Sequence, residues 1–306
     1  MSDLARHLKD YLRLRRALGF KLEFEGQVLP QLVAYLDAAG TPTLTVELAV
    51  AWAELPQGVR PISLAHRLGA ARGFAKYLQS VDPATEVPPC GIWPSVTRRP
   101  VPYLWSATDI ARLLEAAQAL RPALRAATHA ALFGLLAATG MRVGEAIGLD
   151  RADVSLTDGV LAIRAAKFGR WRLVPLHPSA TDALRSYAAC RDQLCPRPRS
   201  TSFFVSSVGT ALCYGGVHRT FVQLTTVIGL RTPTSRPRIH DLRHSFAVRS
   251  LVQWHRSGVE IDGRMAVLST YLGHVNPAGT YWYLSAAPEL MELAAARLDG
   301  RFGAPQ

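Results

Sequence analysis

Residues 129–149 read HAALFGLLAATGMRVGEAIGL, and this stretch decides how the C-terminal part of the chain folds. The strongly apolar run 129–139 predicts a buried helix, and Gly140 is suited to ending it. Helical sequence resumes directly after the glycine, so we expect Arg142 at a junction between two helices. Glu145 follows three residues later and can reach back to Arg142 along one helix face. An ordinary helix ion pair and a functional site are both consistent with this pattern.

On either side of this stretch the sequence predicts a small β-hairpin and a series of helices. Two β-prone segments, 160–164 and 171–176, are joined by a short connection with Gly169 at the turn. Ser106 is suited to cap the helix that precedes the apolar run. Apolar residues at helical spacing predict helices over 106–120, 179–192, 216–227, 240–255, 263–272 and 288–298. The fold class that follows is mainly α with a small antiparallel β-sheet.

The N-terminal part of the chain predicts a separate helical domain. Residues 1–88 contain helical patterns near 4–14, 28–36, 45–52 and 64–78, the last with Arg67, Arg72 and Lys76 among its apolar positions. The segment 82–102 then holds six prolines and no apolar periodicity, which is typical of an extended connection. We therefore expect three parts: a helical domain over 1–88, a linker over 89–103 and a second domain over 104–306.

The charge of the chain narrows the class of partner. Its 306 residues carry a formal net charge of +12 with a pI of about 10.1, which fits a phosphate-binding surface but also occurs in ribosome-associated and membrane-surface proteins. No apolar run approaches the roughly 20 residues needed to span a bilayer, and the N-terminus lacks the apolar region of a signal peptide. The four cysteines have no paired metal-ligand spacing, so we expect free thiols in a reducing cytoplasm.

The lysines are few, and one of them stands apart. Lys9, Lys21 and Lys76 lie in the first domain, and Lys167 is the sole lysine beyond position 76. Arginine keeps its proton near neutral pH, whereas lysine can release one when its surroundings lower its pKa. Lys167 is therefore a candidate for proton transfer.

Two further motifs near the C-terminus hold groups suited to phosphate chemistry. In RIHDLRHSFA, His240 and Arg243 are three residues apart and share a face of a helix, while His244 is better explained as a structural or supporting residue. If the motif starts the helix, the positive end of the helix dipole also favours a phosphate there. In LGHVNPAGTYWYL, His274 precedes Tyr281 and Tyr283, which lie roughly 200° apart on a helix. One tyrosine should face the site and the other the core.

Together these groups supply what is needed to cut DNA without hydrolysis: a nucleophile, cations for the pentacoordinate phosphorane and an acid for the leaving 5′-oxygen. In this order the motifs resemble the tyrosine recombinases of the phage-integrase family, above all its Xer-like and transposon-encoded integrases. The family pattern has an arginine in TGxRxxE, a hairpin lysine before Arg-x-Val-Pro-Leu, HxxR, LGH, and a tyrosine nine residues after the LGH histidine. Here 283 − 274 = 9 selects Tyr283 over Tyr281. The match is close over 104–285 and looser before it.

The resemblance implies a role for each candidate residue. Tyr283 attacks the scissile phosphate and forms a 3′-phosphotyrosine with a free 5′-hydroxyl. Arg142 and Arg243 clamp the non-bridging oxygens, and Lys167 protonates the leaving oxygen. The remaining residues assist: His240 in proton transfer around the tyrosine, His274 by a hydrogen bond to the phosphate, and Glu145 by supporting the site.

The resemblance also implies how the protein assembles. The two domains form a C-shaped clamp around double-stranded DNA, the first of them as the core-binding domain. A homo-tetramer joins two DNA sites, with the helix 288–298 packing on a neighbouring subunit, and an accessory recombination protein is a possible further partner. The phosphotyrosine conserves the phosphodiester energy, so no ATP, metal or other cofactor is implied. The expected location is the bacterial cytoplasm, at the nucleoid.

Two other functions remain open. A type IB topoisomerase-like or telomere-resolving enzyme uses the same chemistry without exchanging strands between two sites. A non-catalytic DNA-binding regulator would have lost at least one of the catalytic groups, and Arg142, Lys167, Arg243 and Tyr283 are all in place.

Overall fold

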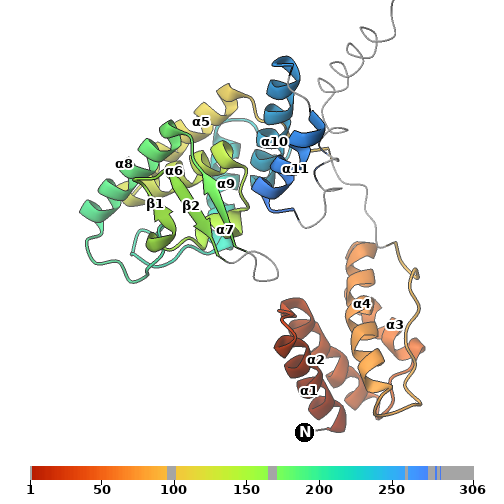
Figure 1. Ribbon diagram of the computed structural model, residues 1–306. Helices are drawn as coiled ribbons and strands as arrows, with labels where there is room; N and C mark the ends of the chain where they lie inside the picture. Colours follow the sequence, from red (N-terminus) through yellow and green to blue (C-terminus); the bar gives the residue numbers. More distant parts are fainter. Residues whose placement is uncertain are drawn as a thin grey trace, which may run out of the picture. The chain divides into compact units, whose positions relative to one another are not determined.

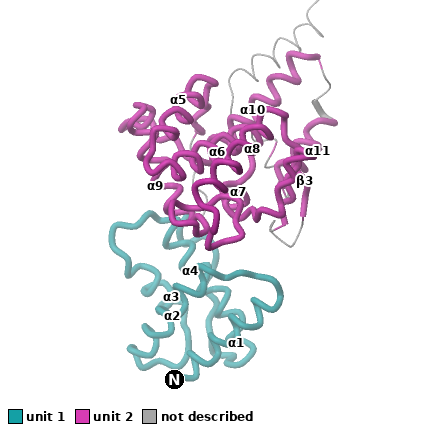
Figure 2. The backbone as a smooth tube through the Cα atoms, turned by 90° about the vertical axis from the view of Figure 1, so that its left-hand side faces the viewer, with its two compact units in different colours: residues 1–100 teal, residues 101–306 magenta. Residues whose placement is uncertain are grey.

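The computed structural model of the chain describes residues 2–94, 101–164, 171–258 and 261–274, together with Thr280 and Tyr283. The chain separates into two compact units, residues 1–100 and 101–306 (Figure 2). The predicted helix over 288–298, the hairpin turn with Lys167, and Tyr281 lie outside the described residues.

Unit 1 contains the four helices predicted from its apolar patterns (Figure 1). They are α1 (Asp3–Ala17), α2 (Glu23–Ala38), α3 (Val46–Glu54) and α4 (Pro61–Leu78). Ser2 and Thr45 cap α1 and α3 by accepting hydrogen bonds from backbone amides of the first turn. The apolar faces of all four helices meet in one core around the fully buried Trp52 and Phe74.

Two of the three basic residues noted in α4 hold unit 1 together. The guanidinium of Arg67 stacks 4.1 Å from the ring centroid of Trp52 and donates a 3.2 Å hydrogen bond to its carbonyl. Arg72 donates to the carbonyls of Pro88 and Pro89 at 2.7 and 2.6 Å. These bonds hold the chain after α4 against unit 1, where Trp93 packs on the core although it lies in the predicted linker. Lys76 remains exposed.

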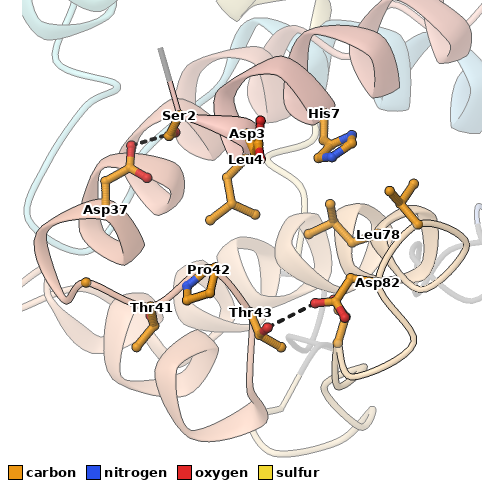
Figure 3. Close-up of a pocket in the computed structure, with 13 residues that line it drawn as sticks. Ser2, Asp3, Leu4, His7, Asp37, Thr41, Pro42, Thr43, Leu78 and Asp82 are labelled. Carbon is orange, nitrogen blue, oxygen red and sulfur yellow. Dashed lines mark hydrogen bonds between the residues drawn. The ribbon is translucent and has the colours of Figure 1, made fainter.

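A pocket of about 750 Å³ opens beside the start of α1 (Figure 3). Its lining includes the carboxylates of Asp3, Asp37 and Asp82. Ser2 donates to Asp37 at 2.8 Å and Thr43 to Asp82 at 3.0 Å, as drawn in Figure 3. These carboxylates make the pocket itself a poor site for phosphate, although the chain as a whole is basic.

Unit 2 is built around α6 (Ala123–Thr139), the predicted apolar helix. Residues from all around α6 are buried, and it packs against α5 (Ala107–Gln118), α8 (Pro178–Leu194) and α10 (Ile239–Arg256). The other helices that the structure describes in unit 2 are α7 (Val143–Ile147), α9 (Tyr214–Val227) and α11 (Ile261–Leu272), with a 3-10 turn η1 (Arg151–Asp153). Trp105 begins the unit by donating its amide to Ser245 Oγ on α10 at 2.7 Å.

The predicted hairpin is present as part of a three-stranded antiparallel sheet. Its strands are β1 (Val154–Ser155), β2 (Val160–Ile163) and β3 (Arg172–Pro175), in the order β1-β2-β3. Leu161 opposes Val174, and both side chains are buried in the core of unit 2. Ile163 opposes Arg172, so the register places Arg172 at the end of the hairpin next to the undescribed turn.

The structure also bears on two expectations from the sequence, the state of the cysteines and the lack of a helix that could span a membrane. All four cysteines are free, as predicted. Among the described helices, none combines the length and the apolar character that crossing a bilayer would require.

The cap of α5 gives a test of unit 2 stability. Ser106 Oγ accepts from the Asp109 amide at 3.0 Å, and the Asp109 carboxylate accepts from the Ser106 amide at 3.2 Å. Ser106→Ala should therefore lower the free energy of unfolding of unit 2 by about 1 kcal/mol, measured by urea denaturation. Ser186→Ala, at an exposed position inside α8, is the control and should change it by less than about 0.5 kcal/mol. Equal effects would contradict the capping role.

Candidate active site

The junction between α6 and α7 positions Arg142. Gly140 ends α6 with a φ of +62°, and a Cβ there would lie 2.6 Å from the ring of Phe246, so both the backbone and the packing require glycine. Arg142 then occupies the N-cap position of α7. Its placement at a helix–helix junction confirms the sequence prediction.

Arg142 is held in place on one side and open on the other. Its Nη1 donates to Glu145 Oε1 at 2.8 Å, and its Nη2 donates to the carbonyl of Gly273 at 3.0 Å. Its amide donates to Glu145 Oε2 at 3.0 Å. The side chain of Arg142 is nevertheless 40% exposed, whereas that of Glu145 is 8% exposed. The guanidinium is therefore fixed by buried groups while part of it remains accessible to a ligand.

Arg172 completes this cluster and was not among the sequence-predicted site residues. Its Nη1 and Nη2 donate to the two oxygens of Glu145 at 3.1 and 2.8 Å, and its Nε donates to the carbonyl of Tyr271 at 3.0 Å. In the sequence it stood out only as part of the Arg-x-Val-Pro-Leu motif, with no signal that it would reach a residue 27 positions away in the chain. Burial alone would raise the pKa of Glu145, but hydrogen bonds from Arg172 and Arg142 outweigh it and lower that pKa.

Arg243 lies in the floor of the site. It is 2% exposed, and its Nη1 and Nη2 donate at 2.8 Å to the carbonyls of Gly140 and Leu272. Tyr283 lies next to its guanidinium. Desolvation lowers the pKa of Arg243, but arginine starts from so high a value that it stays charged near neutral pH.

Two histidines of the site are neutral at physiological pH. Desolvation by the surrounding protein lowers the pKa of His240 to about 4, and the charges of Arg243 and Arg142 contribute, although part of the ring is open to solvent. The pKa of His274 falls to about 4 through the same desolvation and the same two arginines. His274 Nδ1 lies 2.6 Å from Thr280 Oγ1. Neutral rings can accept or donate a hydrogen bond beside these cations.

Tyr283 is buried at the centre of this group. It is 2% exposed, and its ring packs 5.3 Å from His244 and 5.9 Å from His274 between centroids. His244 in turn lies 4.7 Å from His240. The structure therefore brings Tyr283 together with the candidate residues Arg142, Glu145, His240, Arg243 and His274, while Lys167 falls outside the described residues. In the part of the chain that is described, no cluster of histidine, cysteine and acidic side chains could hold a metal ion.

Gly273 allows the contact between Arg172 and the turn after α11. Its φ is +70°, and a Cβ would lie 2.7 Å from Arg172 Nη1. Gly273→Ala should therefore displace Arg172 and lower the free energy of unfolding of unit 2 by about 1–3 kcal/mol, measured by urea denaturation. Gly215→Ala, where a Cβ in α9 meets no atom within 4 Å, is the control and should be neutral or slightly stabilising. A neutral Gly273→Ala would contradict the packing argument.

The neutral histidines should make stability depend on pH. An unfolded histidine has a pKa of about 6.5, whereas His240 and His274 titrate at about 4 in the folded chain. Between these values the unfolded chain binds more protons, so the free energy of unfolding should fall as the pH is lowered from 7 towards 4. Urea denaturation along this pH range should give a shallower decrease for the His240→Gln/His274→Gln variant. Parallel curves would show that these two rings do not carry the effect.

Comparisons with known proteins agree with one another. Residues 105–289 match the Phage integrase family. The protein y4rB of Sinorhizobium fredii, named as an integrase/recombinase, is 44% identical over 310 residues, covering 99% of each chain. The tyrosine recombinase XerD of Halalkalibacterium halodurans is 30% identical over 234 residues, covering 74% of this chain and 72% of its own.

Solved structures share the fold. The Tn1549 transposon integrase, in complex with a circular intermediate DNA, superposes with a TM-score of 0.65 at 15% identity, covering 95% of this chain and 99% of its own. The recombinase XerH in a post-cleavage complex with its difH substrate gives 0.60 at 19% identity, covering 86% of this chain and 75% of its own. At these identities the likeness concerns the fold alone.

Proposed function

Because this chain belongs to the phage integrase family, whose tyrosine recombinases cut and rejoin DNA, we propose that it is a site-specific recombinase with Tyr283 as its nucleophile. The observation that carries the assignment is the burial of Tyr283 beside Arg243 and against the ring of His274, in a cluster that also contains Arg142. A tyrosine next to a fixed arginine is suited to attack a phosphate that two arginines hold. No second tyrosine among the described residues occupies such a position.

The two arginines supply the positive charge that the reaction needs. Arg243 is fixed by two backbone carbonyls and Arg142 by Glu145 and Gly273, so little reorganisation is needed when a phosphate binds. Guanidinium groups match the geometry of phosphate oxygens and strengthen their hydrogen bonds as charge develops. In the proposed reaction they clamp the non-bridging oxygens of the scissile phosphate.

The proton transfers follow from the neutral histidines. The Tyr283 oxygen attacks phosphorus, the bond from phosphorus to the 5′-oxygen breaks, and the tyrosine proton passes to His240. His274 Nδ1 lies 2.6 Å from Thr280 Oγ1. In the proposed tautomer Thr280 donates this bond, and the ring proton is on Nε2, where it binds a phosphate oxygen. Lys167 protonates the leaving 5′-oxygen, a role that rests on the family motif. The reverse attack by a 5′-hydroxyl rejoins the strand.

The same proposal assigns roles to the rest of the chain. Unit 1 serves as the core-binding domain, with residues 89–103 connecting it to the catalytic domain, and the two units close around duplex DNA. Two DNA-bound pairs form a tetramer through residues 288–298, with or without an accessory protein, and the enzyme acts at the bacterial nucleoid. Solved relatives include a lambda integrase dimer bound to a core site and a tetramer bound to a Holliday junction, which supports this arrangement.

Covalent trapping tests the nucleophile. The wild-type protein is incubated with a library of nicked duplexes that includes the ends of its host element, and protein-linked DNA is detected after denaturation. We expect an adduct with the wild type and with Tyr281→Phe but none with Tyr283→Phe, because the proposal makes the Tyr283 oxygen the nucleophile.

Other outcomes would reject parts of this proposal. An adduct that persists in Tyr283→Phe would exclude Tyr283 as the nucleophile. Tight, sequence-specific binding without any adduct would indicate a DNA-binding regulator. Relaxation of supercoiled plasmids that lack any specific site would favour a type IB topoisomerase-like enzyme.

A further inference from the structure

Glu145 is a buried carboxylate that serves two arginines at once. It accepts four hydrogen bonds, two from Arg142 through the amide and Nη1, and two from the fork of Arg172. Charge-assisted bonds of this kind are short and strong, and they hold the carboxylate ionised despite its burial. The side chains of Arg142, Glu145 and Arg172 therefore form one cluster, and not a helix ion pair with a separate neighbour.

The charges of this three-residue cluster do not cancel. Arg142 and Glu145 alone would be a neutral pair, and the positive charge of Arg142 would be largely offset before any phosphate bound. With Arg172 included, the cluster carries one net positive charge. Arg172 is 11% exposed and directed at Glu145, whereas Arg142 is 40% exposed, so the uncompensated charge is presented to a ligand through Arg142.

We infer that Arg172 is a positioning residue that counterbalances Glu145 and so leaves the charge of Arg142 available for the scissile phosphate. The inference rests on the proposed function. Three contacts of Arg172 support this role, namely the fork on Glu145, the bond to the carbonyl of Tyr271, and the close approach to Gly273, whose own carbonyl binds Arg142. The low exposure of Arg172 argues against a direct contact with DNA.

Charge compensation tests this inference, with single-turnover formation of the Tyr283 adduct as the measurement. Arg172→Met should slow cleavage about 100-fold, the effect of losing one stabilising charge at a transition state. Arg172→Lys keeps the charge and should lose less than about tenfold of the rate. Glu145→Gln combined with Arg172→Met removes both charges of the pair and should recover at least about tenfold over Arg172→Met alone, by the logic of a double-mutant cycle.

A purely structural role for Arg172 predicts the opposite results. Arg172→Lys would then be as slow as Arg172→Met, because lysine lacks the planar fork, and the double variant would be slower than either single variant. Either result would overturn the inference. Thermal unfolding is recorded for each protein, to show which variants fold.

If Arg172→Met does not fold, two other comparisons replace it. The cleavage rate of Arg172→Lys is compared with that of the wild type, and the rate of the double variant is compared with that of Glu145→Gln. A loss of tenfold or more in either comparison would reject the role of charge.

Arg151 and Asp192 provide a matched control. Arg151 also makes two bonds to one carboxylate, both of 2.7 Å, at an exposed position outside the site. Arg151→Met should leave the cleavage rate unchanged. If neither the wild type nor Arg151→Met forms an adduct, the proposed function itself fails. If both form it and compensation is absent, only the inference about Arg172 fails.

Discussion

The site in unit 2 depends on one buried carboxylate. Glu145 sits in the first turn of a five-residue helix, yet it joins α7 to strand β3 and, through Arg142 and Arg172, to the turn after α11. A buried carboxylate without partners would be costly and would tend to be protonated. The two arginines offset that cost, and in turn the buried carboxylate holds both guanidinium groups. The positions of Arg142 and Arg172 follow from this arrangement.

Backbone carbonyl oxygens also hold the arginines of the site in place. The carbonyls of Gly140 and Leu272 accept from Arg243, and the carbonyl of Gly273 accepts from Arg142. Two of these carbonyls belong to glycines with positive φ, a conformation that ends a helix and turns the backbone towards the site. Helix ends leave carbonyls without partners inside the helix, and this fold uses them to orient guanidinium groups.

The concentration of positive charge has a second consequence. Desolvation lowers the pKa of His240 and of His274, and the charges of Arg243 and Arg142 lower both pKa values further. The site therefore combines permanent cations, which suit a phosphate ligand, with neutral imidazoles, which can donate or accept hydrogen bonds. In unit 1, by contrast, basic residues have a structural role, because Arg67 and Arg72 of α4 hold the fold together. The pocket of unit 1 is lined by aspartates and is a poor site for phosphate.

Local sequence pattern was enough to predict most of the secondary structure of this protein. Apolar periodicity predicted the helices described in both units, the β-prone segments predicted the hairpin, and Gly140 predicted the junction at Arg142, because each depends on interactions within a few residues. The motif order predicted the family, which the family match confirms, and it also selected Tyr283 as the proposed nucleophile. Arg172 could not be assigned in this way, since its partners Glu145 and Tyr271 come from opposite sides of it in the chain and meet only when α7, β3 and α11 pack. The same holds for the suppressed charge of the histidines and for the burial of Arg243, because desolvation and Coulomb energy depend on distances that only the tertiary structure sets.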